Sequence, residues 1–428
     1  MEIKNKITVI DAIMGKGKTT WAINHLNDKQ NIDDSFIYVT PYRKEIERLQ
    51  KNVNMFYKTM YEPELLYDDE SQTSRKLFGL IDLLNRNYDI ATTHHMFMQL
   101  DERTKQLIKD GHYTLILDEV IEPLSEYEIA KLDIEILKSK NEKGESAISI
   151  DDKGYVHWNT DVNFKGNTKF YKVRNLARTN SLMCIDGKFF IWVYPPEIFK
   201  LFDKIYILTY LFDSSILKGY FDAYNIDYEM KSLDKGKLCE YYEPDHSHFK
   251  KLINIYDGKL NEKYKKESSR KKGRKTNPLS TTWYKNNPAL ISQLANDNYN
   301  YYRNCVNSSS EDFLWTCPEE YREKISRNGY KDNWLAFNTR ATNDYSNKHK
   351  LSYLKNVYIQ PGIEQFFNKY KVNFNQDKYA LSILIQWIWR SAIRNNEPIS
   401  IFIPSKRMRD ILIMWLNNEK IKDKKYAA

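Results

Sequence analysis

The segment AIMGKGKT, from Ala12 to Thr19, contains the residue types that hold the phosphates of a nucleotide. Small residues let backbone N–H groups approach the phosphates, a lysine can reach the β and γ oxygens, and a threonine hydroxyl is a ligand for Mg²⁺. The alternative is a glycine-rich turn that happens to precede Lys-Thr. We predict a nucleotide site, and its expected contacts are Gly15, Lys16, Gly17, Lys18, Thr19 and Thr20.

Two adjacent acids, Asp118 and Glu119, follow the apolar run Leu115–Leu117. At the tip of a strand, Asp118 would hold Mg²⁺ through water, and Glu119 would polarise the water that attacks a phosphoryl group. Paired acids after a strand are also common as solvated turns. The phosphate-binding motif upstream favours the catalytic interpretation, in which Thr19 and Asp118 share the metal ion.

Polar residues also follow two other apolar runs. Hydroxyl groups and backbone amides at the carboxyl ends of parallel strands suit contacts to a nucleic-acid backbone. The expected contacts of this kind are Thr40, Pro41, Arg43, Thr93 and His94. Alternatively, the two threonines merely cap the helices that follow them.

The segment QWIWRSAIR supplies a further set of candidates. On a helix, predicted here over residues 377–394, Gln386, Arg390 and Arg394 would share one face. Such a stripe could be a solvated surface. Two tryptophans beside it favour instead a helix packed between layers, where arginine needs an anionic partner. The γ-phosphate of ATP, approached from another domain, fits that requirement.

The segment KYKKESSRKKGRK, residues 263–275, holds eight basic residues and one acidic residue. It is too polar for a core, and we predict a mobile, solvated loop. Its charge would add sequence-independent affinity for phosphates, through residues that include Lys271, Lys272 and Arg274; a solvated linker without a partner is the alternative. Four aromatic residues further on could stack on bases, although burial is the stronger expectation for them: Trp283, Tyr284, Tyr301 and Tyr302.

The elements that must position these residues alternate along the chain. Apolar runs at 7–11, 36–40, 88–92, 113–117 and 204–209 predict buried strands, and loops or amphipathic helices follow them. This alternation argues for a parallel sheet with helices on both faces. Between about 126 and 192 the pattern changes to β-rich pieces with turn residues, which predicts a hairpin insertion. The alternation then resumes, with apolar runs at 334–337 and 399–403 in the last third of the chain.

Length, composition and charge exclude several classes of protein. The chain has 428 residues, of which 41% are hydrophobic and 29% charged, values that are ordinary for globular proteins and exclude a single small module. Basic residues number 66 against 57 acidic ones, and the net charge of +9 favours a polyanionic partner. The four cysteines lack the spacing of a zinc site or a disulfide framework. Because neither a signal-peptide pattern nor a long apolar run occurs, we expect a cytoplasmic protein without membrane contact.

Taken in chain order, the motifs resemble those of superfamily-2 helicases. D-A-x-M-G-x-G-K-T-T, T-P-Y-R, L-I-L-D-E, L-T-Y, T-R-A-T-N-D and Q-x-x-x-R-x-x-x-R occur in the order of that family and span nearly the whole chain. The chain is similar to phage helicases of the kind related to herpesvirus origin-binding proteins. The resemblance implies Thr209 as a coupling residue and Thr342 with Asn343 at a strand-binding loop. It makes Arg390 and Arg394 candidate arginine fingers without deciding between them.

The resemblance also implies an architecture and an activity. We expect an α/β protein with two RecA-like domains, 1–215 and 216–428, in which the first carries the hairpin insertion and the second the basic loop. ATP and Mg²⁺ would be its cofactors. The implied activity is that of a nucleic-acid-stimulated ATPase, a helicase or translocase on single-stranded or forked DNA in phage replication, in the cytoplasm of the bacterial host and with replication proteins as potential partners. The alternative is a DNA-binding or remodelling factor that ATP switches without strand separation.

Overall fold

The computed structural model describes residues 6–53, 58–68, 73–159, 170–264, 277–339 and 344–421. The chain divides into two compact units, and both are of the expected α/β class with parallel sheets. The first unit consists of Met1–Ala12, Lys16–Tyr241 and Ile359–Phe374, and the second of Ile13–Gly15, Tyr242–Tyr358 and Asn375–Ala428. No helix in the described ranges has the length and apolar character needed to cross a membrane.

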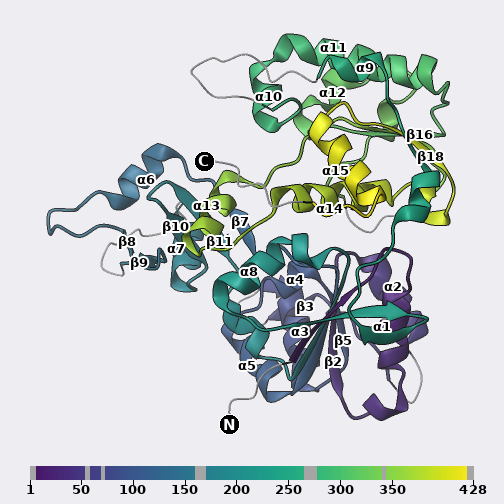
Figure 1. Cartoon of the computed structure of the whole chain (residues 1–428). Coiled ribbons are helices and arrows are strands. Elements are labelled where there is room, and N and C mark those ends of the chain that lie inside the picture. Colours follow the sequence, from purple (N-terminus) through teal and green to yellow (C-terminus); the bar gives the residue numbers. More distant parts are fainter. Residues whose placement is uncertain are drawn as a thin grey trace. The chain divides into compact units, whose positions relative to one another are not determined.

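A seven-stranded sheet forms the centre of the first unit (Figure 1). Its spatial order is β14, β13, β1, β12, β6, β2 and β5. These strands are β1 (Lys6–Asp11), β2 (Ser35–Thr40), β5 (Ile90–Thr93), β6 (Tyr113–Asp118), β12 (Lys204–Thr209), β13 (Glu229–Asp234) and β14 (Lys237–Glu240). All neighbours are parallel except β13 and β14. Residues such as Val9, Leu117 and Ile207 are fully buried, as expected for a parallel sheet covered on both faces.

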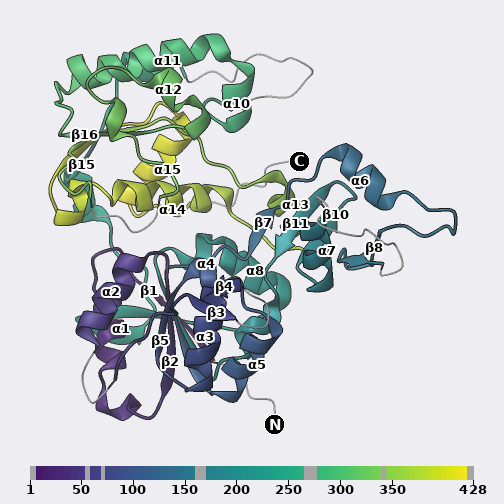
Figure 2. The same cartoon turned by 180° about the vertical axis from the view of Figure 1, so that it is seen from behind.

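Helices connect these strands and cover the sheet (Figure 2). They are α1 (Lys18–Leu26), α2 (Arg43–Asn52), α3 (Lys76–Asn85), α4 (His94–Phe97), α5 (Glu102–Asp110) and α8 (Ile216–Tyr224), and a small hairpin, β3 (Leu66–Asp68) with β4 (Thr73–Arg75), precedes α3. The five strands predicted for this part of the chain all occur, with boundaries shifted by two residues at most. Strands β13 and β14 extend the same sheet, so the first unit continues past residue 215.

Residues 124–193 form a separate group of mostly antiparallel strands. Strands β10 (Leu182–Ile185), β11 (Phe189–Val193) and β7 (Leu124–Glu126) make a three-stranded sheet, and β8 (Ile148–Ile150) pairs with β9 (Val156–Trp158). Helices α6 (Lys131–Lys138) and α7 (Tyr171–Arg178) belong to the same segment. Its side chains bury a core of their own, which includes Leu137, Val156 and Phe190.

Helix α13 (Pro361–Lys369) comes from far downstream and packs on this three-stranded sheet (Figure 2). The backbone N–H of Gly362 donates to the carboxylate of Glu126, and the Gln360 side chain accepts from the Glu126 N–H at 3.4 Å. A Cβ atom on Gly362 would lie 2.7 Å from both Glu126 Oε1 and Ile191 Cδ1. Glycine is therefore required for this close approach, which joins a late segment of the chain to the first unit.

The second unit is built on a four-stranded parallel sheet in the order β15, β18, β17 and β16. Its strands are β15 (Ile253–Ile255), β16 (Phe313–Thr316), β17 (Lys350–Tyr353) and β18 (Ile399–Phe402), and its helices are α9 (Lys259–Glu262), α10 (Thr281–Asn286), α11 (Pro288–Asn300), α12 (Arg322–Ile325), α14 (Gln376–Ile388) and α15 (Lys406–Leu416). The four aromatic residues considered for base stacking, Trp283, Tyr284, Tyr301 and Tyr302, are at most 3% exposed. They belong to one core cluster, which confirms the expectation of burial.

Two predicted elements of this unit are wrong in detail. The run 334–337 contributes only a bridge between Trp334 and Trp315, and the strands are β16 and β17 instead. The helix predicted over 377–394 ends at Ile388, because the amide of Ala392 donates to the carbonyl of Lys348 instead of continuing the helical ladder. A 3₁₀ turn, η8 (Ala392–Asn395), follows. The polar stripe expected on one helix face therefore does not form, since that spacing requires an unbroken helix.

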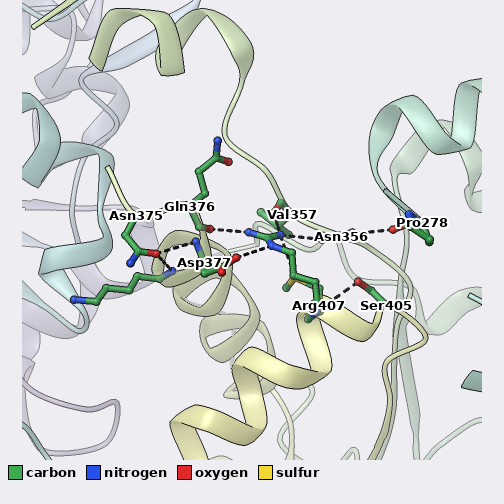
Figure 3. Close-up of polar contacts among 10 residues, drawn as sticks. Pro278, Asn356, Val357, Asn375, Gln376, Asp377, Ser405 and Arg407 are labelled. Carbon is green, nitrogen blue, oxygen red and sulfur yellow. Dashed lines mark hydrogen bonds and ion pairs between the residues drawn. The ribbon is translucent and has the colours of Figure 1, made fainter. Parts of the chain in front are cut away.

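Arg407 of α15 contacts two segments of the second unit (Figure 3). One segment ends just before the stretch that carries α13, and the other begins just after it. Its Nε lies 2.6 Å from Oδ1 of Asp377, whose side chain is 4% exposed. Its remaining nitrogens donate to Asn356 Oδ1 at 2.9 Å, to the Val357 carbonyl at 2.6 Å and to the Gln376 carbonyl at 3.0 Å. One guanidinium thus satisfies acceptors in the segments on both sides of α13, a geometry that the flexible ammonium of lysine cannot reproduce.

Replacing Arg407 with alanine should lower the free energy of unfolding of the second unit by about 3–5 kcal/mol, because the buried Asp377 carboxylate loses its cation. The measurement is urea unfolding followed by tryptophan fluorescence. Lys406→Ala is the matched control: this neighbour is exposed, forms a surface ion pair with Asp410, and should change stability by less than about 1 kcal/mol. Equal effects of the two changes would contradict a structural role for Arg407.

Candidate nucleotide-binding site

The loop between β1 and α1 is shaped by two glycines in the left-handed region, Gly15 (φ 84°) and Gly17 (φ 88°). Residues with a side chain rarely adopt this conformation, so the sequence needs glycine at both positions. A Cβ atom on Gly15 would meet nothing within 4 Å, and one on Gly17 would meet only Thr20 Cβ at 4.0 Å. Gly17 is also the N-cap of α1, and no side chain caps that end. No atom of the described residues crowds either glycine on the side where a Cβ would project, which suits a phosphate-binding loop.

Lys18 begins α1 and lies among three carboxylates. Its Nζ donates to the backbone carbonyl of Ala12, so the side chain folds back over its own loop. Burial lowers the pKa of Lys18, while the charges of Glu119, Asp11 and Asp118, in that order, act to raise it. The ends of β1 and β6 therefore bring all four charged groups together, although they are far apart in the sequence.

Strand register explains this convergence. Asp11 is the partner of Thr209, and Leu208 is the partner of Asp118, so the carboxyl ends of β1, β12 and β6 lie level with one another. The Ala12 amide also donates to the Thr209 carbonyl at 3.0 Å. Strand β12 thus lies between the strand that leads into the phosphate-binding loop and the strand that ends in the acidic pair, so these two strands are two strand spacings apart and Thr209 lies between their ends.

Asp118 ends β6 in a half-buried position. Burial raises the pKa of Asp118 to about 7, the charge of Glu119 adds to this, and Lys18 opposes it. The Tyr38 hydroxyl also lowers the pKa of Asp118. Its contacts with the described residues do not reach normal hydrogen-bond geometry. A divalent cation would reduce the free-energy cost of burying the charged Asp118 side chain, because its charge favours the ionised carboxylate.

The oxygen ligands that this site offers suit a cation that is also bound by water and by the phosphates of a nucleotide. Among the described residues, no group of three or more His, Cys, Asp or Glu side chains could hold a metal ion by itself. A carboxylate and a hydroxyl, from Asp118 and Thr19, fit Mg²⁺, which usually keeps several water ligands and binds phosphate oxygens. The residues present are therefore compatible with Mg²⁺ that is bound together with a nucleotide.

Glu119 adopts a left-handed backbone conformation, with φ 72°. Its N–H donates to the Leu208 carbonyl at 2.9 Å, which fixes this conformation at the end of the strand. Side-chain-bearing residues in this region are uncommon and cost of order 1 kcal/mol or more. The turn directs the half-buried Glu119 away from the regular path of β6, beside Lys18.

Asp11 is a site residue for which the sequence indicated no role. Its two carboxylate oxygens accept from Leu211 N at 3.1 Å and Phe212 N at 2.7 Å. Burial raises the pKa of Asp11 to about 6, although both hydrogen bonds oppose the shift. Asp11 therefore anchors the turn after β12 to the strand that carries the phosphate-binding loop. An acid directly before such a loop was the available signal.

The other candidates of the first unit lie along the same sheet edge in different surroundings. Thr40 is fully buried and its hydroxyl has no hydrogen-bond partner among the described residues, while Tyr42 is the N-cap of α2, so the capping alternative is wrong for Thr40. Thr93 does cap α4, accepting from the Met96 N–H at 3.3 Å. His94 Nε2 lies 3.0 Å from the Asp118 carbonyl.

Two of these candidates lie nearer the surface. Pro41 is half-buried, and the exposed Arg43 pairs with Glu62 at 2.8 Å. A nucleic-acid backbone would therefore have to compete with Glu62 for the Arg43 guanidinium.

The candidates of the second unit are only partly described. Thr342, Asn343, Lys271, Lys272 and Arg274 lie outside the described residues. Gln386 is half-buried in α14, and Arg390 lies just beyond the helix end and is 7% exposed. Arg394 is exposed in η8. Of the two candidate arginines, Arg394 is thus the accessible one.

Comparison with known proteins gives matches over most of the chain. Residues 247–416 match the family described as the YonV C-terminal Rossmann-like domain, and residues 124–192 match the YonV middle domain. The chain is 36% identical over 427 residues to the SPbeta prophage-derived uncharacterized protein YonV of Bacillus subtilis (strain 168), covering 97% of this chain and 100% of that protein.

Two solved structures are also similar in part. One is S. tokodaii Xpd4 (TM-score 0.44, 11% identity, 98% of this chain and 95% of that chain). The other is the DUF1998 helicase MrfA bound to DNA and AMPPNP (TM-score 0.36, 9% identity, 98% of this chain and 49% of that chain).

Proposed function

The chain belongs to the YonV family, and from this premise and the geometry of the site we propose that it is a nucleic-acid-stimulated ATPase of a phage. The observation that carries the proposal is the convergence of Lys18, Asp118 and Glu119 at the level carboxyl ends of β1, β12 and β6, beside an open glycine loop. A strand, a loop with positive-φ glycines and an uncapped helix start form the context that phosphate binding requires.

Each residue has a task in hydrolysis. Amides of the loop would hold the β- and γ-phosphates, and Lys18 would leave the Ala12 carbonyl to balance the charge of the γ-phosphate. Glu119 would orient the attacking water and accept its proton. Asp118 and Thr19 would hold Mg²⁺, which supplies charge neutralisation at the phosphate oxygens.

The partner that we propose is DNA, single-stranded or forked, on which the protein acts as a helicase or translocase of the superfamily-2 type in phage replication. The net charge of +9 and the basic segment 263–275 support a polyanionic partner. Asp11 and Thr209 join the nucleotide loop to the turn after β12, so that turn is the element through which occupancy of the site would be transmitted.

The test is the ATPase rate measured without nucleic acid and with single-stranded DNA, duplex DNA and RNA, next to a strand-displacement assay on forked DNA. We expect stimulation by single-stranded DNA and displacement of the second strand. Stimulation without displacement would favour a remodelling factor that ATP switches. No hydrolysis under any condition would contradict the proposed function.

Arg394 is the arginine that we propose for stabilising charge in the transition state, because it is exposed whereas Arg390 is buried. Arg394→Ala should reduce turnover by about 10³-fold while weakening ATP binding much less, since such a residue acts mainly in the transition state. Arg394→Lys should not restore the rate, because lysine lacks the planar fork. Arg390→Lys is the comparison and should chiefly lower stability. Wild-type turnover in Arg394→Ala would exclude this residue from hydrolysis.

A further inference from the structure

A cluster at the carboxyl edge of β16 and β17 combines two cations with two half-buried aromatic rings. The guanidinium of Arg322 lies 5.0 Å from the ring centre of Trp334, and Nζ of Lys355 lies 5.3 Å from that of Phe337. Cys317 stands between the pairs: Trp334 Nε1 donates to its carbonyl at 3.3 Å, and both cations act electrostatically on its thiol. We call Arg322, Trp334, Phe337 and Lys355 the Trp334 cluster.

The cations of the Trp334 cluster are incompletely partnered. Among the described residues, neither Arg322 nor Lys355 has a carboxylate oxygen within 4.0 Å. Lys355 makes one hydrogen bond, to Thr281 Oγ1 at 2.8 Å, although an ammonium has three N–H groups to donate. Arg322 Nε is buried and has no hydrogen-bond partner in the described part of the chain. Lys355 is buried, with 7% of its surface exposed, and Arg322 is half-buried. Buried cations in this state gain most from an added anion.

The rings of the cluster lie at the margin of the core: Trp334 packs against the core cluster of this unit, and both rings are less buried than the four aromatic residues first considered for base stacking. Trp283, Tyr284, Tyr301 and Tyr302 lie in the core, whereas Trp334 and Phe337 are half-buried. The Trp334 segment is joined to β16, because Leu335 N donates to the Trp315 carbonyl at 3.0 Å. Because a cation lies over one face of each ring, a base would stack on the other face, with its phosphates close to the cations.

We propose that the Trp334 cluster binds single-stranded nucleic acid, with bases stacked on Trp334 and Phe337 and backbone phosphates at Arg322 and Lys355. The proposal rests on the proposed function and specifies where the second unit contacts the strand. Recognition of this kind reads no base identity, because every base has a stacking face.

One acid opposes this binding. Burial lowers the pKa of Lys355 to about 8, and the charge of Glu320 opposes that shift. The bound phosphate must therefore compete with Glu320. Removing that carboxylate by Glu320→Gln should tighten the binding of the strand.

The experiment compares the affinities of the full chain for an oligo-dT strand, an abasic strand of equal length and inorganic polyphosphate, by fluorescence anisotropy at several salt concentrations. Phe337→Leu should weaken oligo-dT binding by about 5- to 100-fold and leave abasic binding unchanged, since it removes only stacking. Lys355→Met should weaken both and reduce the salt slope by about one. Phe337→Tyr keeps a ring and should bind as the wild type does.

Lys251→Gln is the matched control, because it removes an exposed charge next to β15, the opposite edge of the sheet. If folded Phe337→Leu and Lys355→Met proteins bind oligo-dT as tightly as the wild type does, the cluster is not a binding site, whereas the proposed ATPase stands. Equal wild-type affinity for dT and abasic strands would overturn the stacking contact. If binding depends on the cluster but no ATP is hydrolysed, the cluster is supported as a binding site and the proposed function is contradicted.

Discussion

Lys18→Ala should reduce ATP hydrolysis by at least about 10²- to 10³-fold, the loss seen when one preorganised charge-stabilising donor is removed. Lys18 is the cation that the acidic residues Asp11, Asp118 and Glu119 surround, so its removal leaves their charges uncompensated beside an incoming triphosphate. Nucleotide affinity should therefore fall together with turnover. Steady-state kinetics and titration with a fluorescent ATP analogue measure the two effects separately.

Lys16→Ala provides the matched control, because Lys16 is exposed in the same loop, two positions before Lys18. Its removal changes the charge of the loop by the same amount and should lower the rate only slightly. If both variants lose activity equally, the effect is one of overall loop charge. If Lys18→Ala hydrolyses ATP as the wild type does, the loop does not hold a reacting phosphate.

The parts of this molecule that were predictable from sequence depend on contiguous residues. The phosphate-binding loop follows from a short motif between an apolar run and a helix, and the structure gives both of its glycines the positive φ that such a loop needs. Likewise, fully buried parallel strands such as β6 are continuous apolar runs, so their positions could be predicted closely. The roles assigned to the residues at their ends stay predictions.

The parts that were not predictable depend on contacts between distant segments. Helix α14 ends at Ile388 because the Ala392 amide pairs with Lys348, and nothing in the local sequence marks that stop. Helix α13 joins the first unit through Gly362 and Glu126, which are far apart in the chain. The anchoring of the Leu211 turn by Asp11 is of the same kind. Local periodicity cannot indicate such pairings, because it reports only on residues a few positions apart in the chain.

Asp118→Asn should raise the stability of the nucleotide-free protein at pH 8 and abolish Mg²⁺-dependent hydrolysis. The folded protein raises the pKa of Asp118 from 3.8 to about 7, so it binds this proton more tightly than the unfolded chain does. The contribution of Asp118 to stability is therefore fully present below about pH 4 and is lost as the pH rises to about 7. Asparagine never ionises, and its advantage over aspartate should grow across that window.

Thermal unfolding in EDTA between pH 5 and 8 measures this difference, with Asp33→Asn, an exposed carboxylate of the same unit, as a control that should follow the wild type. Adding Mg²⁺ and ATP should then narrow this difference in stability. The wild type gains about 2.7 kcal/mol when the ligand is present at 100 times its Kd, while the variant, which lacks the carboxylate that would hold the cation, gains much less. A variant that is stabilised by Mg²⁺ and ATP as strongly as the wild type, or that keeps its turnover, would show that the Asp118 carboxylate does not hold a metal ion.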